Sequence, residues 1–152
     1  MKEKNMDFFL PLIIAALSGV AMAVQGTLNS YMSKIIGQLE ATFMVHIIGL
    51  AAVVVALFGF KIGQGNLGKL GEVPWYGYLG GIISVLIIYG VVASMPKVGV
   101  ANATTAIIVG QVTTALLIDC TGLLGFEKCP MTWMKFLGVM LLAAGAKLML
   151  SK

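Results

Sequence analysis

The residues of this sequence that are best suited to chemistry are hydrogen-bonding side chains set within long apolar runs. Amide, hydroxyl and imidazole groups can hold a polar solute through hydrogen bonds, and an imidazole or carboxylate can also exchange a proton. Polar groups at membrane depth need partners, so the helices that carry them are expected to face protein, water or a ligand. The candidate binding residues are Gln25, Asn29, His46, Thr104, Gln111 and Asp119.

In the first apolar run, the polar residues follow a helical stripe. Ser18, Met22, Gln25 and Asn29 have the i, i+4, i+7 and i+11 spacing of one helix face. This face is expected to point toward a protein or aqueous interior. The alternative is that the amides only join helices, an interaction of about 0.6–2 kcal/mol each. The sequence leaves both interpretations open.

The fourth run is uncharged from Val98 to Ile118 and is unusually polar for a membrane span. Thr104 and Gln111 share one face of the expected helix, and Asp119 lies at its edge. For Gln111, solute binding and helix joining are both open, whereas threonines are expected to bond the preceding turn of their own helix. Asp119 either binds solute or a proton, or caps the turn at Gly122.

His46 is the one histidine of the chain and lies close to the start of the second run. An interfacial or internally hydrogen-bonded histidine is the favoured interpretation. If its imidazole titrates, it could couple a proton to binding. Asn102 is expected to be a helix N-cap after a tight turn formed by Pro96 and Gly99.

Enzymatic chemistry finds little support in the sequence. No nucleophile with a neighbouring base, no metal-ligand set and no cofactor fingerprint can be assembled, so no enzyme activity, metal or cofactor is predicted. The glycine-rich segment from Gly63 to Gly71 matches neither the G-x-G-x-x-G spacing of a dinucleotide-binding loop nor that of a Walker A phosphate loop. It is expected to be a loop without helix. Cys120 and Cys129 match no redox or metal motif, and two free thiols are favoured over a disulfide.

Composition identifies an integral membrane protein. Apolar residues make up 59% of the 152 residues, charged residues only 11%, and the mean hydropathy is +1.00. The net charge of +4 comes from scattered lysines, which favours contact with a lipid surface over nucleic-acid binding. Two early lysines and Ala21-Met-Ala23 resemble a secretory signal, but a retained first helix is favoured because the apolar pattern continues beyond Ala23.

The expected fold is all-α, a single domain with five membrane-spanning helices. Pro74, Trp75 and Tyr76 suit the start of the third span at the level of the lipid headgroups. The expected spans are about 8–33, 41–60, 74–95, 99–121 and 131–150. Glu40 ends a short connection that begins at Ile35.

Two pairs of glycines are expected to form smooth surfaces for helix packing. Gly77 and Gly81 have G-x-x-x-G spacing in the third span, and Gly138 and Gly145 lie on one stripe of the fifth. These surfaces could receive another helix of the same chain or of a partner.

An odd number of spans puts the chain ends on opposite sides, and the lysines divide almost evenly between those sides. The weak bias permits insertion in both orientations. The side of the N-terminus carries Lys2, Lys4, Lys61, Lys69, Lys128 and Lys135, and the other side carries Lys34, Lys97, Lys147 and Lys152.

Several short motifs resemble a known family. Gly19 to Ser30 reads G-x5-Q-G-x-L-N-S, Pro96 begins P-x-x-G-x-A, and Gly110 to Gly125 reads G-Q-x6-I-D-x-x-G-x-x-G. Pro74-Trp75 followed by Gly80-Gly81 is similar too. Together these motifs resemble the small bacterial YdcZ family of the drug/metabolite transporter superfamily over nearly the whole chain. Cys120 stands where members of that family often carry a histidine.

The resemblance implies a five-helix, EamA-like half of a ten-helix exporter in the bacterial inner membrane, with two inverted halves around the path. A lone half would then pair with an antiparallel copy or with an oppositely oriented paralogue. The leading hypothesis is a transporter of a small polar or amphiphilic metabolite or drug. The alternatives are a membrane scaffold that binds another membrane protein and, with little weight, an intramembrane enzyme using His46 and Asp119.

Overall fold

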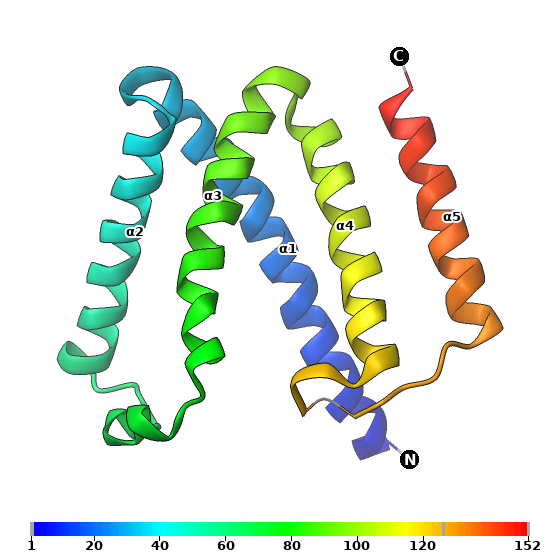
Figure 1. Cartoon of the computed structure of the whole chain (residues 1–152), viewed down its shortest axis with the longest axis horizontal. Helices are drawn as coiled ribbons and strands as arrows, with labels where there is room; N and C mark the ends of the chain where they lie inside the picture. The colour runs from blue at the N-terminus through cyan, green and yellow to red at the C-terminus, as the bar shows by residue number, and fades with distance from the viewer. Residues whose placement is uncertain (1, 126, 152) are drawn as a thin grey trace. The chain divides into compact units, whose positions relative to one another are not determined.

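The computed structural model describes residues 2–125 and 127–151, and the side chains of residues 9–123, 125 and 127–151 (Figure 1). This part of the chain is all helical, without a strand, and contains five helices long and apolar enough to cross a membrane. The predicted fold class is therefore confirmed. Of the lysines counted above, Lys152 and the side chains of Lys2 and Lys4 lie outside the described residues.

The long helices are α1 (Lys2–Ile36), α2 (Gln38–Val54), α3 (Leu79–Val98), α4 (Val100–Thr121) and α5 (Trp133–Leu150). A five-residue π-helical segment extends α2, and a 3-10 turn precedes α3. The short elements are η1 (Val55–Gly59), η2 (Leu67–Glu72), η3 (Trp75–Tyr78) and η4 (Leu123–Gly125).

Two of the helix connections are single glycines, which is shorter than expected. Gly37 separates α1 from α2 with φ of 103°, and Gly99 separates α3 from α4 with φ of 87°. Side chains with a Cβ rarely adopt these backbone angles, so glycine allows an abrupt break. The expected connection from Ile35 to Glu40 was too long, and the turn expected from Pro96 and Gly99 is confirmed at Gly99 but not at Pro96. Pro96 remains inside the last turn of α3, because its fixed φ fits a helix.

Two further local expectations were wrong. Asn102 is not an N-cap: Gly99 holds that position, and the Asn102 side-chain amide donates to the carbonyl of Val98 at 3.0 Å. The glycine-rich segment is not a loop throughout, because it contains the 3-10 helix η2. The Asn66 side chain caps η2 by accepting a hydrogen bond from the Gly68 amide at 2.8 Å.

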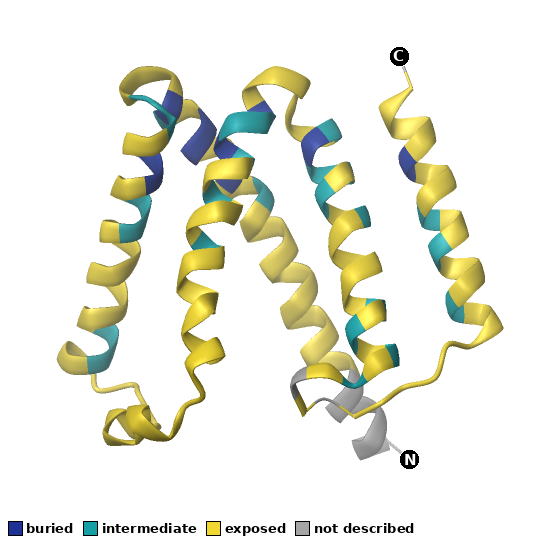
Figure 2. Ribbon diagram, viewed as in Figure 1, coloured by how far each residue is buried: buried dark blue, intermediate teal, exposed yellow. Residues whose placement is uncertain are grey.

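The first compact unit, Met1–Lys97, contains α1, α2 and α3. α2 and α3 run antiparallel, and α1 crosses close to α3 at Gly26 (Figure 1). A Cβ at Gly26 would lie 2.7 Å from Met95 Cε and 3.0 Å from Val91 Cγ1, so the crossing depends on the missing side chain. The most buried residues of this unit are Gly26, Asn29, Ser30, Ser33, Ala41, Thr42, Val92 and Met95 (Figure 2).

The second unit, Val98–Lys152, contains the antiparallel pair α4 and α5. α4 ends at Gly122, whose φ is 68° and whose amide donates to the carbonyl of Ile118 at 2.9 Å. The Cys129 amide donates to the Asp119 carbonyl at 2.9 Å, which holds the connecting segment against the end of α4. Thr132 caps α5 by accepting a hydrogen bond from the Lys135 amide at 3.3 Å.

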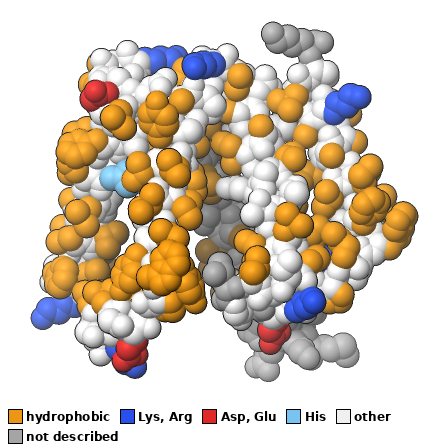
Figure 3. Space-filling view, viewed as in Figure 1, with side chains coloured by type: hydrophobic (Ala, Val, Ile, Leu, Met, Phe, Trp, Pro, Cys, Tyr) orange, Lys and Arg blue, Asp and Glu red, His pale blue; other side chains and the backbone are white. Residues whose placement is uncertain are grey.

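The surfaces of both units suit a lipid environment. Only 6–11% of the most apolar window of each span is buried within the chain. Apolar side chains cover the visible helix surfaces, and the charged side chains drawn lie near helix ends (Figure 3). Trp75 and Trp133, at the starts of the third and fifth spans, are 75% and 73% exposed, as expected for rings at the headgroup level.

Candidate functional site in the membrane spans

In the first unit, His46 joins α2 to α3. Its Nδ1 lies 2.7 Å from the carbonyl oxygen of Thr42, and its Nε2 lies 3.0 Å from Ser84 Oγ. A carbonyl only accepts, so Nδ1 carries a hydrogen, and in the neutral ring Nε2 accepts from the Ser84 hydroxyl. Both ring nitrogens are therefore hydrogen-bonded, and the imidazole links two neighbouring helices.

Ser84 was missing from the predicted site. It lies 38 residues from His46 in the sequence, and the helix pattern alone does not show which residues of α2 and α3 meet. The available indication was a single hydroxyl within an otherwise apolar stretch from Leu79 to Ile88. Such a residue in a membrane span usually has a hydrogen-bonding partner.

The predicted polar stripe of α1 divides in the structure. Asn29 is only 7% exposed and lies beside Ser30 and Ser33, which are also buried. Ser33 Oγ donates to the Ser30 carbonyl at 2.8 Å, whereas Ser30 Oγ has no hydrogen-bond partner among the described residues. Gln25, one turn earlier, is exposed. The buried face of α1 therefore includes Asn29 and excludes Gln25.

In the second unit, the threonines of α4 behave in two ways. Thr105 and Thr113 donate to the carbonyls of Ala101 and Val109 at 2.9 and 2.7 Å, which confirms the prediction of bonding within the same helix. Thr104 differs: its Oγ1 is buried and has no hydrogen-bond partner in the described part of the chain. A hydroxyl left in this state is available to water or a solute.

Gln111 and Asp119 occupy exposed positions on α4. Gln111 lies near the middle of the span, and Asp119 lies close to its end. Asp119 lines a groove between α4 and α5 together with Lys135. The Gly122 amide donates to the Ile118 carbonyl, and the Cys129 amide donates to the Asp119 carbonyl. Backbone hydrogen bonds therefore hold the turn at Gly122, and these bonds do not involve the Asp119 carboxylate.

The glycines expected to pack do not contact another helix in the described structure. A Cβ added at Gly81, Gly138 or Gly145 would meet no described atom within 4 Å outside its own helix backbone. Gly77 lies in η3, and a Cβ there would approach the side chain of Val73 at 2.9 Å. These glycines therefore leave smooth surfaces open to lipid or to another chain.

The two cysteines lie at the same end of the second unit. Both are free thiols, with Cys129 exposed and Cys120 partly buried. Lys135 Nζ donates to Cys129 Sγ at 2.9 Å. Among the described residues, no cluster of three or more His, Cys, Asp or Glu side chains could hold a metal ion.

Comparison with protein families identifies the chain. Residues 10–148, nearly the full length, match the family described as "Putative inner membrane exporter, YdcZ". No curated protein and no solved structure matches the chain. Together with the five spans, the match shows a multi-pass protein of the inner membrane. The chain therefore belongs to the YdcZ family of membrane transporters.

Proposed function

We propose that this protein exports a small polar or amphiphilic solute, working as an antiparallel dimer by alternating access. Membership of an exporter family supports transport as the general activity. The candidate contacts for the solute are Gln25, Asn29, His46, Thr104, Gln111 and Asp119.

The single observation that carries this proposal is the exposure of Gln111 near the middle of α4. Transfer of an unpaired amide from water to a hydrocarbon environment costs about 4–8 kcal/mol. An exposed glutamine at this depth is therefore unfavourable next to lipid tails and favourable next to water, a solute or a second copy. A transport path supplies all three.

The chemical class of the solute follows from the charges of the spans. No carboxylate occurs between Phe8 and Ser33, so the first span cannot provide a fixed anionic site for a cation at midplane. Amides and hydroxyls instead favour a neutral polar group, and the surrounding apolar side chains favour an attached hydrocarbon part.

The antiparallel dimer is supported by the near balance of lysines on the two sides, six against four in the sequence. Weak charge bias allows one chain to insert in both orientations. Two oppositely inserted copies would form inverted repeats, and rocking of one copy against the other would expose a shared path alternately to each side.

Flux through proteoliposomes tests the transport proposal. Purified protein should give saturable flux for a member of a broad panel of neutral and amphiphilic metabolites. Gln111→Ala should reduce this flux by about two- to tenfold, the equivalent of one lost hydrogen bond. Thr113→Ala is the matched control, because the Thr113 hydroxyl bonds its own helix. This variant should transport the solute at the wild-type rate. No saturable flux for any compound, or equal flux in Gln111→Ala, would contradict the proposal.

Reporters fused to both chain ends test the dimer. Each reporter should give signal on both sides of the membrane if the protein inserts in two orientations. A single fixed orientation would contradict the homodimer and require an oppositely oriented paralogue.

A membrane scaffold is the second candidate, favoured by the open surface at Gly81. In that case a stoichiometric protein partner should remain bound to the wild-type protein in mild detergent. Gly81→Leu should abolish this binding, and Gln111→Ala should leave the partner bound. The two variants therefore separate the candidate functions.

A further inference from the structure

A groove of about 330 Å³ lies between α4 and α5 and combines an apolar wall with two opposite charges. The apolar residues include Val112 and Leu116 of α4 and Val139 of α5. The complete lining is Val112, Ala115, Leu116, Asp119, Lys135, Gly138 and Val139.

The two charged side chains of this groove do not form a direct ion pair. Among the described residues, no ion pair with an N···O distance within 4.0 Å joins Asp119 to Lys135. The Lys135 ammonium donates to Cys129 Sγ at 2.9 Å, and an ammonium has three N–H donors, so two remain. A carboxylate and an ammonium that share a groove without pairing can each accept an opposite charge from a ligand.

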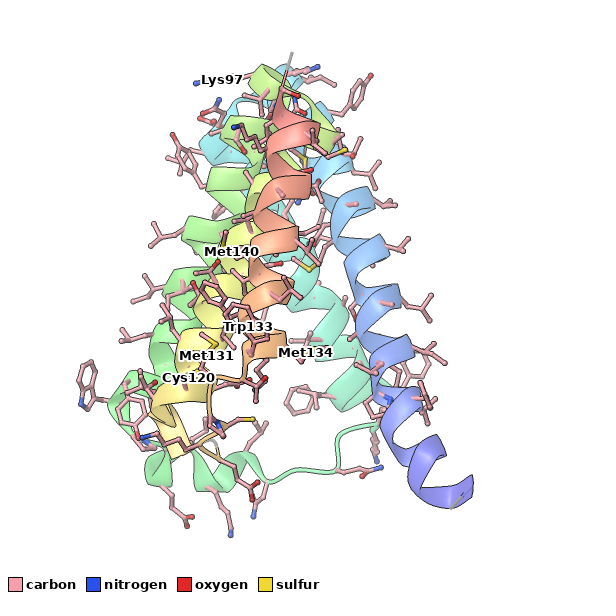
Figure 4. The ribbon with its side chains drawn as sticks, turned by 90° about the vertical axis from the view of Figure 1, so that its right-hand side faces the viewer. Lys97, Cys120, Met131, Trp133, Met134 and Met140 are labelled. Atoms are coloured by element: carbon pink, nitrogen blue, oxygen red, sulfur yellow. The ribbon has the colours of Figure 1, made fainter. Side chains whose placement is uncertain are left out.

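Both charges lie at one end of the groove, near the level expected for lipid headgroups. Asp119 is close to the end of α4 at Thr121, and Lys135 is in the first turn of α5. Cys120 and Trp133, the neighbours of these residues, lie at the same end of the helix pair in Figure 4, and Met140 lies farther along α5. The apolar wall extends in that inward direction, toward the hydrocarbon core.

We propose that this groove binds a zwitterionic phospholipid of the bilayer. Its ammonium group lies beside Asp119, its phosphate lies beside Lys135, and one acyl chain follows the apolar wall formed by Val112, Leu116 and Val139. Charge complementarity at the rim and the inward direction of the wall specify this occupant. The groove shares Asp119 with the candidate solute contacts of the proposed transport path, but lipid retention is a separate readout that can be measured without knowing the solute.

A second groove between the same helices provides an internal comparison. It has a volume of about 660 Å³ and carries one cationic side chain, Lys147, with no acidic residue in its lining. It therefore has no group that favours a zwitterion over an anion. Its lining is Ala106, Val109, Ala143, Ala146, Lys147, Leu150 and Ser151.

Native mass spectrometry of the purified full chain tests the headgroup contacts. The protein in mild detergent is incubated with phosphatidylethanolamine, which is zwitterionic, or phosphatidylglycerol, which is anionic, with identical acyl chains. We expect wild type to retain more phosphatidylethanolamine. Asp119→Asn should lower the ratio of the two retained lipids by up to about fivefold, since an exposed charge pair contributes about 0.2–1 kcal/mol.

Two lysine variants separate the grooves. Lys135→Gln should weaken retention of phosphatidylethanolamine, whereas Lys147→Gln, in the groove without a carboxylate, should leave it unchanged. An unchanged lipid ratio in Asp119→Asn, or equal losses in both lysine variants, would overturn the proposal.

A glycine pair tests the acyl-chain contact and does not depend on charge. Gly138 lines the groove and has open space at its Cβ position, so Gly138→Leu can fill the groove without a backbone clash among the described residues. Gly145→Leu is the matched control, because Gly145 is equally open but lines neither groove. Phosphatidylethanolamine retention should fall in Gly138→Leu alone. Equal retention in both variants would count against the site.

Discussion

The two units of the chain differ in the placement of some of their polar and small residues. In the first unit, His46 is hydrogen-bonded on both ring nitrogens, and Gly26 lets α1 approach Met95 of α3 closely. In the second unit, Gln111 is exposed and Gly138 meets nothing within 4 Å among the described residues. His46 and Gly26 therefore contact a second helix of their own unit, whereas Gln111 and Gly138 remain available to lipid, a solute or another chain.

The contrast separates residues that hold the fold from residues that are candidates for function. A polar side chain with an internal partner contributes to helix association, and its loss should lower stability. A polar side chain without one costs stability in lipid unless water, a solute or another chain contacts it. Substitutions in the two units should therefore affect different measurements, and the predictions below follow in order of decreasing expected effect on stability.

The largest loss of stability is expected from Gly26→Leu. The Cβ alone would lie 2.7 Å from Met95 Cε and 3.0 Å from Val91 Cγ1, so the larger side chain requires Met95 and Val91 to move or α1 to shift away from α3. Overpacking of this kind costs about 1–3 kcal/mol. Thermal unfolding in detergent should show a clear fall in melting temperature.

Gly19→Leu is the control for this variant, because Gly19 lies on the same helix with no described atom within 4 Å of its Cβ position. Its melting temperature should match that of wild type. Equal melting temperatures for the two variants would show that the close α1–α3 crossing at Gly26 does not contribute to the stability of the first unit.

A smaller loss is expected at the hydrogen bond between His46 and Ser84. In a double-mutant cycle of His46→Phe and Ser84→Ala, the coupling energy should be about 0.6 kcal/mol and no more than about 1.7 kcal/mol, the range for such bonds between membrane helices. Chemical denaturation of the four proteins measures it. Additive effects of the two substitutions would show that His46 does not hold α2 to α3.

The fold was largely predictable from the sequence because the bilayer imposes one strong constraint. Each span needs about 20 apolar residues, and five such runs are visible in the hydropathy pattern. The ends of the helices were less predictable. Gly37 and Gly99 each break the chain in a single residue, whereas flanking polar residues and Pro96 suggested longer or earlier turns.

The candidate site was less predictable than the fold, since helix periodicity gives a face but not its neighbour. Gln25 and Asn29 are close to one stripe, yet only Asn29 is buried. Only the structure shows that Ser84 bonds His46 and that Lys135 shares a groove with Asp119, because each lies on the following helix. Such pairs depend on helix register, which side-chain packing determines.

In the second unit, Gln111→Leu should not lower the stability of the monomeric chain by more than about 0.5 kcal/mol, as for other exposed positions. The amide has no internal contact to lose, and leucine is at least as compatible with a detergent micelle. The same denaturation measurement used for His46→Phe provides the comparison. A loss as large as that of His46→Phe would place Gln111 among the residues that hold the fold.

The smallest effect is expected from Thr113→Val. The Thr113 hydroxyl donates only to the Val109 carbonyl of its own turn, at 2.7 Å, and that carbonyl retains its bond within the helix backbone. Valine has nearly the same shape, so melting temperature and lipid retention should both remain at wild-type values.

Thr104→Val is the informative variant to compare with Thr113→Val. The buried Thr104 hydroxyl has no partner among the described residues, so its removal should be neutral or stabilising. Destabilisation by Thr104→Val with none by Thr113→Val would mean that Thr104 already bonds a water or a second chain, and α4 would then resemble the first unit at that position.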